Sequence, residues 1–384
     1  MKIALASSLS KITNMGIASG QEAWAVNFIS ESIKKDYVFD LFAVRKSLSI
    51  PNKVNLISVV EESTFEKKNQ LIRKNDEFID EDVKRISFIG FARTMTFLKE
   101  REKDYSLVID STGNALISMN WDMFNIPLLI IAHLPVENRY LSLYKYFPIQ
   151  KNTYFVFISK YQYERANWIP EQNKFLVYNG ILLEDIKLSV VGNQNDLVWV
   201  GRIDPSMKKG AKEAIEIAKK VNKSLKMYTF VENEEYFNEQ IKPLLNEKII
   251  IHRDFTPKDE IYKDKKAFIY PLLWEEPFGL VLIEAMAYGI PIVTFARGAT
   301  PEIVKDGITG FIVNYSDQDI RGDWIIKKTG IEGFCEAVEK IYSMPEQEYQ
   351  AMRLACRKHI EEKFTAKKMI KDYEKIYSKI LSKT

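Results

Sequence analysis

Short apolar runs alternate with longer polar stretches of helical length through the whole chain. In the first half the runs of strand length are residues 3–6, 39–43, 54–59, 107–109, 128–132 and 154–158. The second half repeats the pattern at residues 197–200, 225–230, 249–252, 267–270, 292–295 and 311–313. Alternating strands and helices are typical of a parallel sheet with helices on both faces. The pattern therefore predicts an α/β fold with two doubly wound, Rossmann-like domains.

A stretch of mixed character, residues 181–195, separates the two sets of strands and is expected to be a hinge and linker. We therefore expect an N-terminal domain over residues 1–185 and a C-terminal domain over residues 195–363. Residues 364–384 place apolar side chains at helical intervals and are expected to form a final helix. Sheets of this class bind ligands beyond the carboxyl ends of their strands, so a ligand cleft is expected between the domains.

One unit of strand, helix and strand carries two carboxylates, Glu276 and Glu284. Pro277 follows the first carboxylate, and proline is favoured at the first position of a helix. The sequence therefore predicts that Glu276 caps a helix that begins at Pro277. The helix is expected to run to about Tyr288, with Gly289 as its left-handed stop.

Eight residues of helix would bring Glu284 to within about 80° of Glu276 around the axis and roughly 12 Å further along it. A single extended ligand could then reach both carboxylates. The N–H groups at the start of a helix attract anions, so a diphosphate is expected at Phe278, Gly279 and Leu280. On spacing alone, the favoured interpretation is that Glu276 is an ordinary helix cap and Glu284 a partly solvated helix residue, without a ligand.

A second strand is followed by basic residues. The apolar run at residues 197–200 leads to Arg202 and then to Lys209, in the sequence GRIDPSMKKG. A diphosphate needs cationic donors at such a strand end, both for binding and to neutralise charge that develops on a leaving group. Lys208 is a less favoured candidate than Lys209 for binding the diphosphate. The pattern fits equally well with Arg202 and Lys209 as solvated residues beside a turn that bind no ligand.

Glycines follow the first strand of the chain. Gly16 and Gly20 lie in a loop that leads into a helix, and glycines at such a turn let backbone amides approach a phosphate. Gly20 is the preferred candidate for this contact with a phosphate and Gly16 is the alternative. The pattern also fits two turn glycines that bind no ligand.

His133 follows the apolar run LLIIA and is expected at a strand end facing the cleft.

The segment EPFGLVLIEAMAYGIPIV, followed by GATPEIVKDGITGFIV, resembles the signature of the family-four retaining glycosyltransferases. Their hallmark is a Glu, seven residues and a second Glu, and the resemblance covers most of the second half closely. It implies the GT-B fold, in which two Rossmann-like doubly wound domains face a central cleft. It also implies that the final helix, residues 364–384, crosses back to the N-terminal domain.

The resemblance assigns roles to the candidate residues. It implies that Glu276 contacts the donor sugar, that Glu284 contacts the nucleotide ribose, and that Arg202 and Lys209 bind the diphosphate. His133 matches a family histidine that contacts the donor sugar.

The resemblance is weaker elsewhere. Ser19 and Gly20 stand where the family usually has two adjacent glycines. The nucleotide base is expected near Val231 and Arg253, where this chain lacks the glycines of the family, so the identity of the base stays open. Weaker matches at the edge of the cleft are Ser159, Asn179 and Gly180.

The composition is that of an ordinary globular protein, with 384 residues of which 46% are hydrophobic and 28% charged. A net charge of +3 without zinc-finger or RNP patterns gives no indication of nucleic-acid binding. Two isolated cysteines, Cys335 and Cys356, argue against a disulfide scaffold. No apolar run reaches the roughly 18 residues of a membrane span, and MKIALASSLS is better explained as a first strand than as a signal peptide. A cytoplasmic enzyme is therefore expected.

Residues 65–103 are charge-rich and helical in pattern, with one apolar face flanked by basic residues. Such a face fits peripheral contact with the inner face of a membrane or with an acceptor. Packing against the sheet of the N-terminal domain is the favoured alternative. The face consists of Ile86, Ile89, Phe91, Met95 and Leu98.

Together these features predict a retaining glycosyltransferase that moves a hexose from a nucleoside-diphosphate sugar to a hydroxyl acceptor, with a UDP-sugar favoured by its frequency in the family. The acceptor would attack on the face from which the diphosphate leaves, and the leaving phosphate oxygen would take its proton. No metal or cofactor is expected, because Arg202 and Lys209 supply positive charge. Replacing either residue by alanine is expected to abolish transfer with little loss of stability.

Other functions fit the same residues. A nucleotide-sugar epimerase and a phosphorylase are known on the GT-B fold, and a catalytically silent sugar-nucleotide-binding partner in a glycan-assembly complex is also consistent. The acceptor, expected on the N-terminal domain, could be a lipid-linked glycan, a polysaccharide, a protein or a small molecule.

Overall fold

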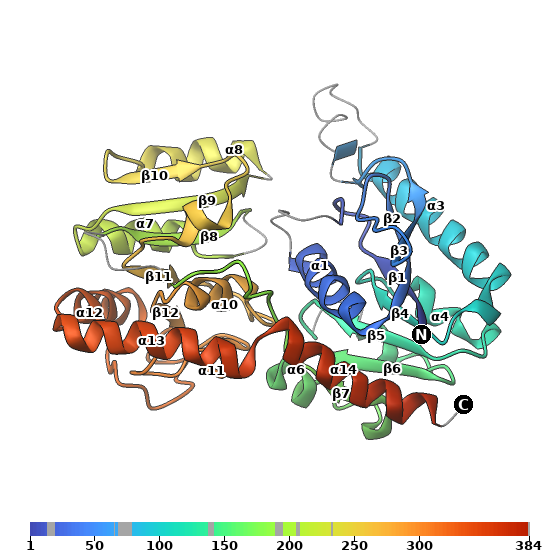
Figure 1. Cartoon of the computed structure of the whole chain (residues 1–384). Helices are drawn as coiled ribbons and strands as arrows, with labels where there is room; N and C mark the ends of the chain where they lie inside the picture. Colours follow the sequence, from blue (N-terminus) through green and yellow to red (C-terminus); the bar gives the residue numbers. More distant parts are fainter. Residues whose placement is uncertain are drawn as a thin grey trace. The chain divides into compact units, whose positions relative to one another are not determined.

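The computed structural model describes residues 1–13, 20–64, 66–67, 79–136, 142–188, 195–204, 208–231 and 233–382. The chain divides into two compact units, which are shown in Figure 1. Unit 1 consists of Met1–Gly180 and Ala366–Thr384, and unit 2 of Ile181–Thr365. The chain therefore passes from unit 1 to unit 2 and returns to unit 1 with its last helix.

Unit 1 is built on a seven-stranded parallel sheet with the order β3-β2-β1-β4-β5-β6-β7. The strands predicted from the apolar runs are present, and β7 is an additional strand that the pattern missed. It has only three residues and begins with a lysine, so no apolar run marks it. The strands are β1 Lys2–Ser7, β2 Val38–Val44, β3 Val54–Val60, β4 Leu107–Ser111, β5 Leu128–Ala132, β6 Thr153–Phe157 and β7 Lys174–Leu176.

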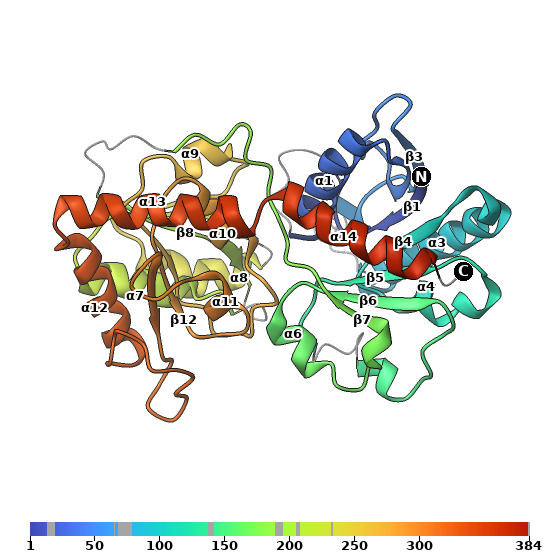
Figure 2. The same cartoon turned by 60° about the horizontal axis from the view of Figure 1, so that its bottom comes forward.

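Helices cover both faces of this sheet. On one face α3 contributes Phe91 and Leu98 to the main apolar core. On the other face α1 and α14 lie side by side, and Phe28 of α1 contacts both Phe39 of β2 and Tyr373 of α14 (Figures 1 and 2). The helices are α1 Gly20–Ser32, α3 Ile79–Glu100, α4 Leu116–Met119, α6 Lys160–Arg165 and α14 Ala366–Leu381, with 3-10 turns at Ile33–Lys35, Glu102–Asp104, Trp121–Met123, Leu143–Lys145 and Glu171–Asn173.

The apolar face expected in residues 65–103 therefore packs mainly on the sheet. Phe91 and Leu98 are buried, and Ile86 and Met95 pack partly against the same core. Ile89 differs, because it is 52% exposed.

Unit 2 is built on a six-stranded parallel sheet with the order β10-β9-β8-β11-β12-β13. All of these strands were predicted. They are β8 Leu197–Ile203, β9 Leu225–Val231, β10 Ile249–His252, β11 Ala267–Tyr270, β12 Ile292–Phe295 and β13 Gly310–Val313. The helices are α7 Ala211–Lys220, α8 Glu234–Tyr236, α9 Lys258–Tyr262, α10 Leu280–Ala287, α11 Thr300–Ile303, α12 Gly330–Tyr342 and α13 Glu346–Lys363, with a π-helical turn at Phe237–Ile241 and a 3-10 turn at Lys242–Leu244.

The start of α10 differs from the prediction. The helix begins at Leu280, and its N-cap is Gly279 in the left-handed region, with φ 98° and ψ 63°. Glu276 and Pro277 precede the helix, so Glu276 is not its cap and the helical estimate of the spacing between the two carboxylates does not apply. The reason is that other side chains bind the Glu276 carboxylate and Gly279 breaks the helical backbone. At the far end the prediction is confirmed, because Gly289 has φ 76° and closes the helix.

The two segments that link the units run beside each other. The backbone N–H of Ile181 donates to the carbonyl of Phe364 at 2.9 Å, and Ile181 forms an isolated parallel bridge with Thr365. Helix α13 ends in unit 2 at Lys363, and α14 begins in unit 1 at Ala366. Within the described part of the chain, no helix combines the length and apolar character needed to cross a membrane.

Candidate functional site

The backbone around Lys209 is fixed to the end of β11. The N–H of Leu273 donates to the carbonyl of Lys208 at 2.8 Å, and the indole N–H of Trp199 donates to the carbonyl of Lys209 at 3.1 Å. Gly210 has φ 77°, and a Cβ atom there would lie 2.0 Å from the carbonyl oxygen of Pro271. Only glycine fits this contact, so the turn that precedes α7 holds Lys209 at the carboxyl end of the sheet.

Glu276 is a buried carboxylate with one oxygen fully occupied. Its Oε2 atom accepts hydrogen bonds from Lys209 Nζ at 2.6 Å, Tyr270 Oη at 2.9 Å and Trp274 Nε1 at 3.0 Å. The side chain is 9% exposed. Among the described residues no hydrogen bond falls on its Oε1 atom.

The Lys209 ammonium lies in an apolar and aromatic setting. Its Nζ atom is 3.9 Å from the ring centroid of Trp274 and 5.8 Å from that of Tyr270. Burial lowers the pKa of Lys209, while the negative charge of Glu276 counteracts this effect. Burial and the same carboxylate raise the pKa of Tyr270, so its hydroxyl stays protonated and donates.

The backbone of Glu276 is held by the loop after β12. The N–H of Ala299 donates to the Glu276 carbonyl at 2.8 Å. Gly298 has φ 58°, and a Cβ atom there would lie 2.2 Å from the carbonyl oxygen of Glu276 and 2.4 Å from its nitrogen. The segment GATPEIV therefore supports Glu276 by backbone packing.

The neighbouring Glu275 is held by two arginines. Its carboxylate accepts from Arg297 at 3.1 Å, from Arg321 at 2.8 Å and from the backbone N–H of Gly298 at 2.6 Å. Asp319 completes the network through ion pairs with both arginines. Although burial opposes it, the arginine hydrogen bonds lower the pKa of Glu275 to about 2. The carboxylate is therefore charged at any physiological pH.

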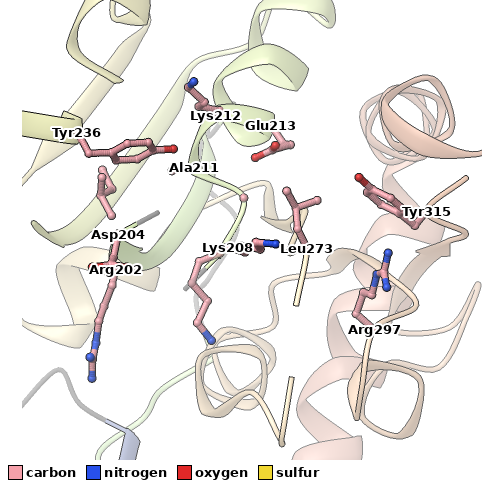
Figure 3. Close-up of a pocket in the computed structure, with 13 residues that line it drawn as sticks. Arg202, Asp204, Lys208, Ala211, Lys212, Glu213, Tyr236, Leu273, Arg297 and Tyr315 are labelled. Carbon is pink, nitrogen blue, oxygen red and sulfur yellow. The ribbon is translucent and has the colours of Figure 1, made fainter. Parts of the chain in front are cut away.

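A pocket of about 300 Å³ opens at this edge of the unit 2 sheet. Arg202, the penultimate residue of β8, and Lys209 both line it, so the two predicted cations are brought together. In Figure 3 the side chains of Arg202 and Lys208 extend in the same direction, and Arg297 lies beside Tyr315 on the other side of the pocket. The remaining lining includes Asp204, Lys212, Glu213, Tyr236 and Leu273.

The second predicted carboxylate, Glu284, lies in α10 and is bound by α9. Its Oε1 atom accepts from Lys258 Nζ at 2.6 Å and its Oε2 atom from Tyr262 Oη at 3.0 Å. The three amides expected to bind a diphosphate lie at the first residue of α10 and at the two residues before it. They belong to Phe278, whose ring packs on Phe364, to the N-cap Gly279 and to Leu280.

The two residues expected near a base lie on neighbouring strands. Val231 ends β9, and Arg253 follows β10. The guanidinium of Arg253 pairs with Glu234 and lies 4.7 Å from the ring centroid of Phe237. Its charge is therefore already partnered within unit 2.

Unit 1 holds the remaining candidates. His133 directly follows β5, and its Nε2 atom is 2.9 Å from the hydroxyl of Ser111, at the end of β4. Trp24 contacts the imidazole ring edge-on, with ring centroids 4.9 Å apart. Burial lowers the pKa of His133 to about 3, so the ring is neutral. Gly20 is the first residue of α1, and a Cβ atom there would meet nothing within 4 Å.

The other sequence candidates in unit 1 have local partners or lie outside the description. Gly16 and Ser19 are not among the described residues. Ser159 caps α6 by accepting from the N–H of Gln162 at 3.3 Å. Asn179 is buried, and the N–H of Gly180 lies 3.3 Å from the sulfur of Met369.

Comparisons with known proteins agree with this geometry. Residues 183–327 match the family model described as glycosyl transferases group 1. An uncharacterized 41.2 kDa protein in the cps region of Klebsiella pneumoniae is 25% identical over 233 residues, which are 57% of this chain and 59% of that protein. The chain thus spans less than two thirds of this relative.

Solved structures match over the whole chain. Sucrose-phosphate synthase from Thermosynechococcus elongatus superposes with a TM-score of 0.78 at 15% identity, covering 100% of both chains. Anabaena HepE in complex with UDP and glucose gives 0.71 at 15% identity, covering 99% of this chain and 100% of that one. The fold is that of the GT-B glycosyltransferases. The match to the group 1 family falls within unit 2.

Several residues of unit 2 that contact the candidate site were not found from the sequence. Tyr270 and Trp274 stand in or beside an apolar run that reads as a strand, and nothing in the run marks them as partners of a carboxylate. The other missed residues contact the predicted carboxylates or their neighbours from distant positions. They are Lys258, Tyr262, Arg297, Gly298, Asp319 and Arg321.

An Asp-x-Asp sequence, Asp317 and Asp319, was overlooked in the expectation of a metal-free site. Asp319 is paired with Arg297 and Arg321, and Asp317 accepts a hydrogen bond from the hydroxyl of Thr329 at 2.7 Å. Both carboxylates thus have protein partners. Across the described ranges, no group of three or more His, Cys, Asp or Glu side chains is arranged to hold a metal ion.

Proposed function

We propose that the protein is a retaining glycosyltransferase that moves a hexose from a nucleoside-diphosphate sugar, with UDP as the favoured nucleotide, to a hydroxyl acceptor. The observation that carries the proposal is the Glu276 carboxylate, whose Oε2 atom is bound by Lys209, Tyr270 and Trp274, while no hydrogen bond from the described residues falls on Oε1. It lies within the segment that matches the group 1 family. The UDP bound by Anabaena HepE, which has the same fold, supports the choice of nucleotide.

The donor would be held by unit 2. Glu276 Oε1 would accept a hydrogen bond from a sugar hydroxyl, and Glu284 would bind the ribose. Arg202, Lys209 and the amides at the start of α10 would bind the diphosphate. In this arrangement the donors would lie where negative charge grows as the diphosphate leaves, and such donors lower the barrier.

In the proposed reaction the acceptor hydroxyl attacks the anomeric carbon on the face from which the diphosphate departs. The bond between that carbon and the phosphate oxygen breaks, and its electron pair stays on the oxygen. That oxygen takes the acceptor proton, so no separate base is needed and the configuration is retained. Arg202 and Lys209 stabilise the leaving group, and the proposal includes neither a metal nor a cofactor. His133, neutral at all relevant pH values, would serve as a hydrogen-bonding contact for the sugar.

Gly20 is proposed to let the backbone at the start of α1 approach the diphosphate, since nothing in the protein crowds that position. Gly16 is the alternative for the same role. Val231 and Arg253 are proposed to lie near the base. The acceptor is proposed to bind unit 1.

The protein is proposed to act at a membrane surface, which it would contact through α3. Phe88 and Ile89 are 63% and 52% exposed, and Lys84, Arg85 and Arg93 stand beside them on the helix. Exposed apolar side chains flanked by cations suit an anionic membrane surface. Co-sedimentation with anionic vesicles tests the contact, and equal binding of wild type and of the Phe88→Glu, Ile89→Glu variant would contradict it.

The proposed reaction is tested first by binding and then by product analysis. A nucleotide sugar at 100 times its dissociation constant should stabilise the protein by roughly 2.7 kcal/mol in a thermal-shift screen. Transfer to an acceptor with retained configuration, read by NMR, supports the proposal. Change of the sugar nucleotide without acceptor would instead indicate an epimerase, dependence on inorganic phosphate a phosphorylase, and binding without turnover a silent partner.

The role of the cations is tested with Arg202→Ala. Loss of the guanidinium removes charge stabilisation from the leaving diphosphate, so we expect kcat to fall by at least about 100-fold, as for removal of a single oxyanion donor. Lys219→Ala is the control, because Lys219 is exposed at the far end of α7. Near-normal turnover by Arg202→Ala would refute the proposed role.

A further inference from the structure

Both oxygens of the Glu284 carboxylate are bound by side chains of α9. Lys258 Nζ lies 2.6 Å from Oε1, and Tyr262 Oη lies 3.0 Å from Oε2. The two donors differ in position, since Tyr262 is 1% exposed and the Lys258 side chain is 43% exposed. A ligand that approaches Glu284 from solvent therefore meets Lys258 beside Oε1, whereas Tyr262 lies on the buried side.

The backbone of Lys258 is held in place although its side chain is exposed. The hydroxyl of Tyr288 donates to Asp259 Oδ1 at 2.5 Å, and the rings of Tyr262 and Tyr288 stack with centroids 5.6 Å apart. These contacts join α9 to the end of α10. The ammonium group can thus adjust locally without moving the helix that carries it.

The chemistry of the pair suits a hydroxyl group that donates and accepts at once. A carboxylate only accepts hydrogen bonds, and an ammonium group only donates them, with three protons available. A ribose hydroxyl at Oε1 can donate to Glu284 while its oxygen accepts a second proton of Lys258. The ion pair need not break, so the buried carboxylate never loses its charged partner.

We propose that Lys258 is a specificity-determining residue that reads one ribose hydroxyl of the donor nucleotide together with Glu284, and so distinguishes ribonucleotide from deoxyribonucleotide donors. This inference rests on the proposed function, in which Glu284 binds the ribose. A second ribose hydroxyl that bound Oε2 would find the proton of Tyr262 already donated to that oxygen and would receive no such donor. The two hydroxyls are therefore recognised unequally.

Calorimetry with UDP, 2′-deoxy-UDP and 3′-deoxy-UDP tests the inference. For the wild type we expect one deoxy nucleotide to bind roughly tenfold or more weakly than UDP, the size of a lost charge-assisted hydrogen bond. In Lys258→Met that discrimination should fall to within about threefold of unity. Lys258→Gln, which keeps an N–H donor without the charge, should retain part of it. Lys263→Met is the matched control, because Lys263 is exposed at the end of the same helix, and it should behave as wild type.

The outcomes separate the inference from the function on which it rests. Discrimination by Lys258→Met equal to that of the wild type would overturn the role of Lys258, even if UDP affinity fell, because a merely structural loss weakens all three nucleotides alike. If the wild type binds another nucleoside diphosphate in place of UDP, the deoxy forms of that nucleotide are used. No binding of any nucleoside diphosphate would overturn the proposed function, and the inference with it.

Discussion

The Glu276 carboxylate is nearly enclosed by protein, and a buried charge is stable only when charged or polar groups accompany it. Three donors on Oε2 meet that need, and Lys209 is the one that carries a balancing charge. Lys209 is itself only 15% exposed. Each member of the pair therefore compensates the other, in addition to any role toward a ligand.

Lys209→Ala should consequently destabilise the protein as well as stop transfer, contrary to what the sequence alone suggested. Removing one partner of a buried pair costs about 3 kcal/mol or more, because the other charge is left behind. Urea unfolding of Lys209→Ala, Glu276→Gln and the double variant measures the coupling. The double variant should be more stable than Lys209→Ala, since the uncompensated carboxylate is gone. Additive losses would show that the pair does not contribute through mutual charge compensation.

At the level of elements, the segment that carries Glu276 is positioned by loops after three different strands. The end of β11 leads into it, the loop after β12 packs Gly298 on its backbone, and the loop after β13 brings Arg321 to Glu275. Glu276 lies before α10 and depends on these loops rather than on a helix for its position.

Gly298→Ala tests the backbone contact. A Cβ atom would lie 2.2 Å from the Glu276 carbonyl, so we expect a loss of about 2–4 kcal/mol from left-handed strain and overpacking together, with reduced activity. Gly330→Ala is a matched control, because Gly330 has φ 60° and its added Cβ would meet only the carbonyl oxygen of Tyr315, at 3.3 Å. That variant should lose about 1–2 kcal/mol and keep its activity. Equal activities in a transfer assay would show that the contact does not position Glu276.

Because of the Glu275 network, we expect the free energy of unfolding to fall at low pH. The carboxyl has a pKa of about 2 when folded, below its ordinary 4.5, so its contribution is complete above pH 4.5 and is lost as the pH falls toward 2. The shift corresponds to about 3 kcal/mol at most. Because the side chain is 25% exposed, solvent screening reduces this to ~1–2 kcal/mol.

Urea unfolding at pH 7 and pH 2.5 measures this contribution. Glu275→Gln should be less stable than the wild type at pH 7, and the difference should shrink at pH 2.5. Glu332→Gln, at an exposed position of α12, should follow the wild type at both values. A difference between Glu275→Gln and wild type that does not change with pH would contradict the assignment.

The elements that could be predicted are those that sequence pattern determines locally. The bounds of β5, β10, β11 and β12 agree with their apolar runs. In β5, β11 and β12 every residue is buried, so an apolar residue marks each position of the strand. The edge strand β10 is only partly buried, and its run of isoleucines marks it. The start of α10 could not be predicted, since Pro277 favours a helix start while tertiary contacts of Glu276 and the left-handed Gly279 place it later.

For the site, charged residues beside strand ends could be named, but their partners could not. Lys209 and Glu276 were each identified, yet their direct ion pair depends on how two loops fold against each other. Tyr270 and Trp274 were missed because an aromatic residue in an apolar run looks like core. Lys258 and Arg321 were missed because nothing in their local sequence shows which distant carboxylate they reach.

For the whole molecule, the C-terminal helix supports the candidate site of unit 1 through a chain of aromatic contacts. Tyr373 of α14 is fully buried, and its ring lies 5.0 Å from that of Phe28 and 6.2 Å from that of Trp24. Trp24 in turn contacts His133. The position of His133 thus depends on residues from both ends of the chain.

Tyr373→Ala should destabilise unit 1 by about 3–5 kcal/mol, the cost of emptying a large buried aromatic site. Tyr373→Phe keeps the ring and should change stability by much less. Hydrogen exchange followed by mass spectrometry distinguishes the units, since faster exchange is expected over residues 1–180 and unchanged exchange over residues 181–365. If hydrogen exchange became equally faster in both units, the result would show that α14 does not stabilise unit 1 alone.

The double crossing between the units also sets an order of assembly on the ribosome. Residues 1–180 emerge first, but the aromatic faces of Trp24 and Phe28 remain uncovered until α14 has been synthesised, after the whole of unit 2. Unit 2 is continuous in sequence and can complete its sheet while the chain is still growing. Unit 1 is therefore begun before unit 2 but can close its core only after unit 2 has been translated.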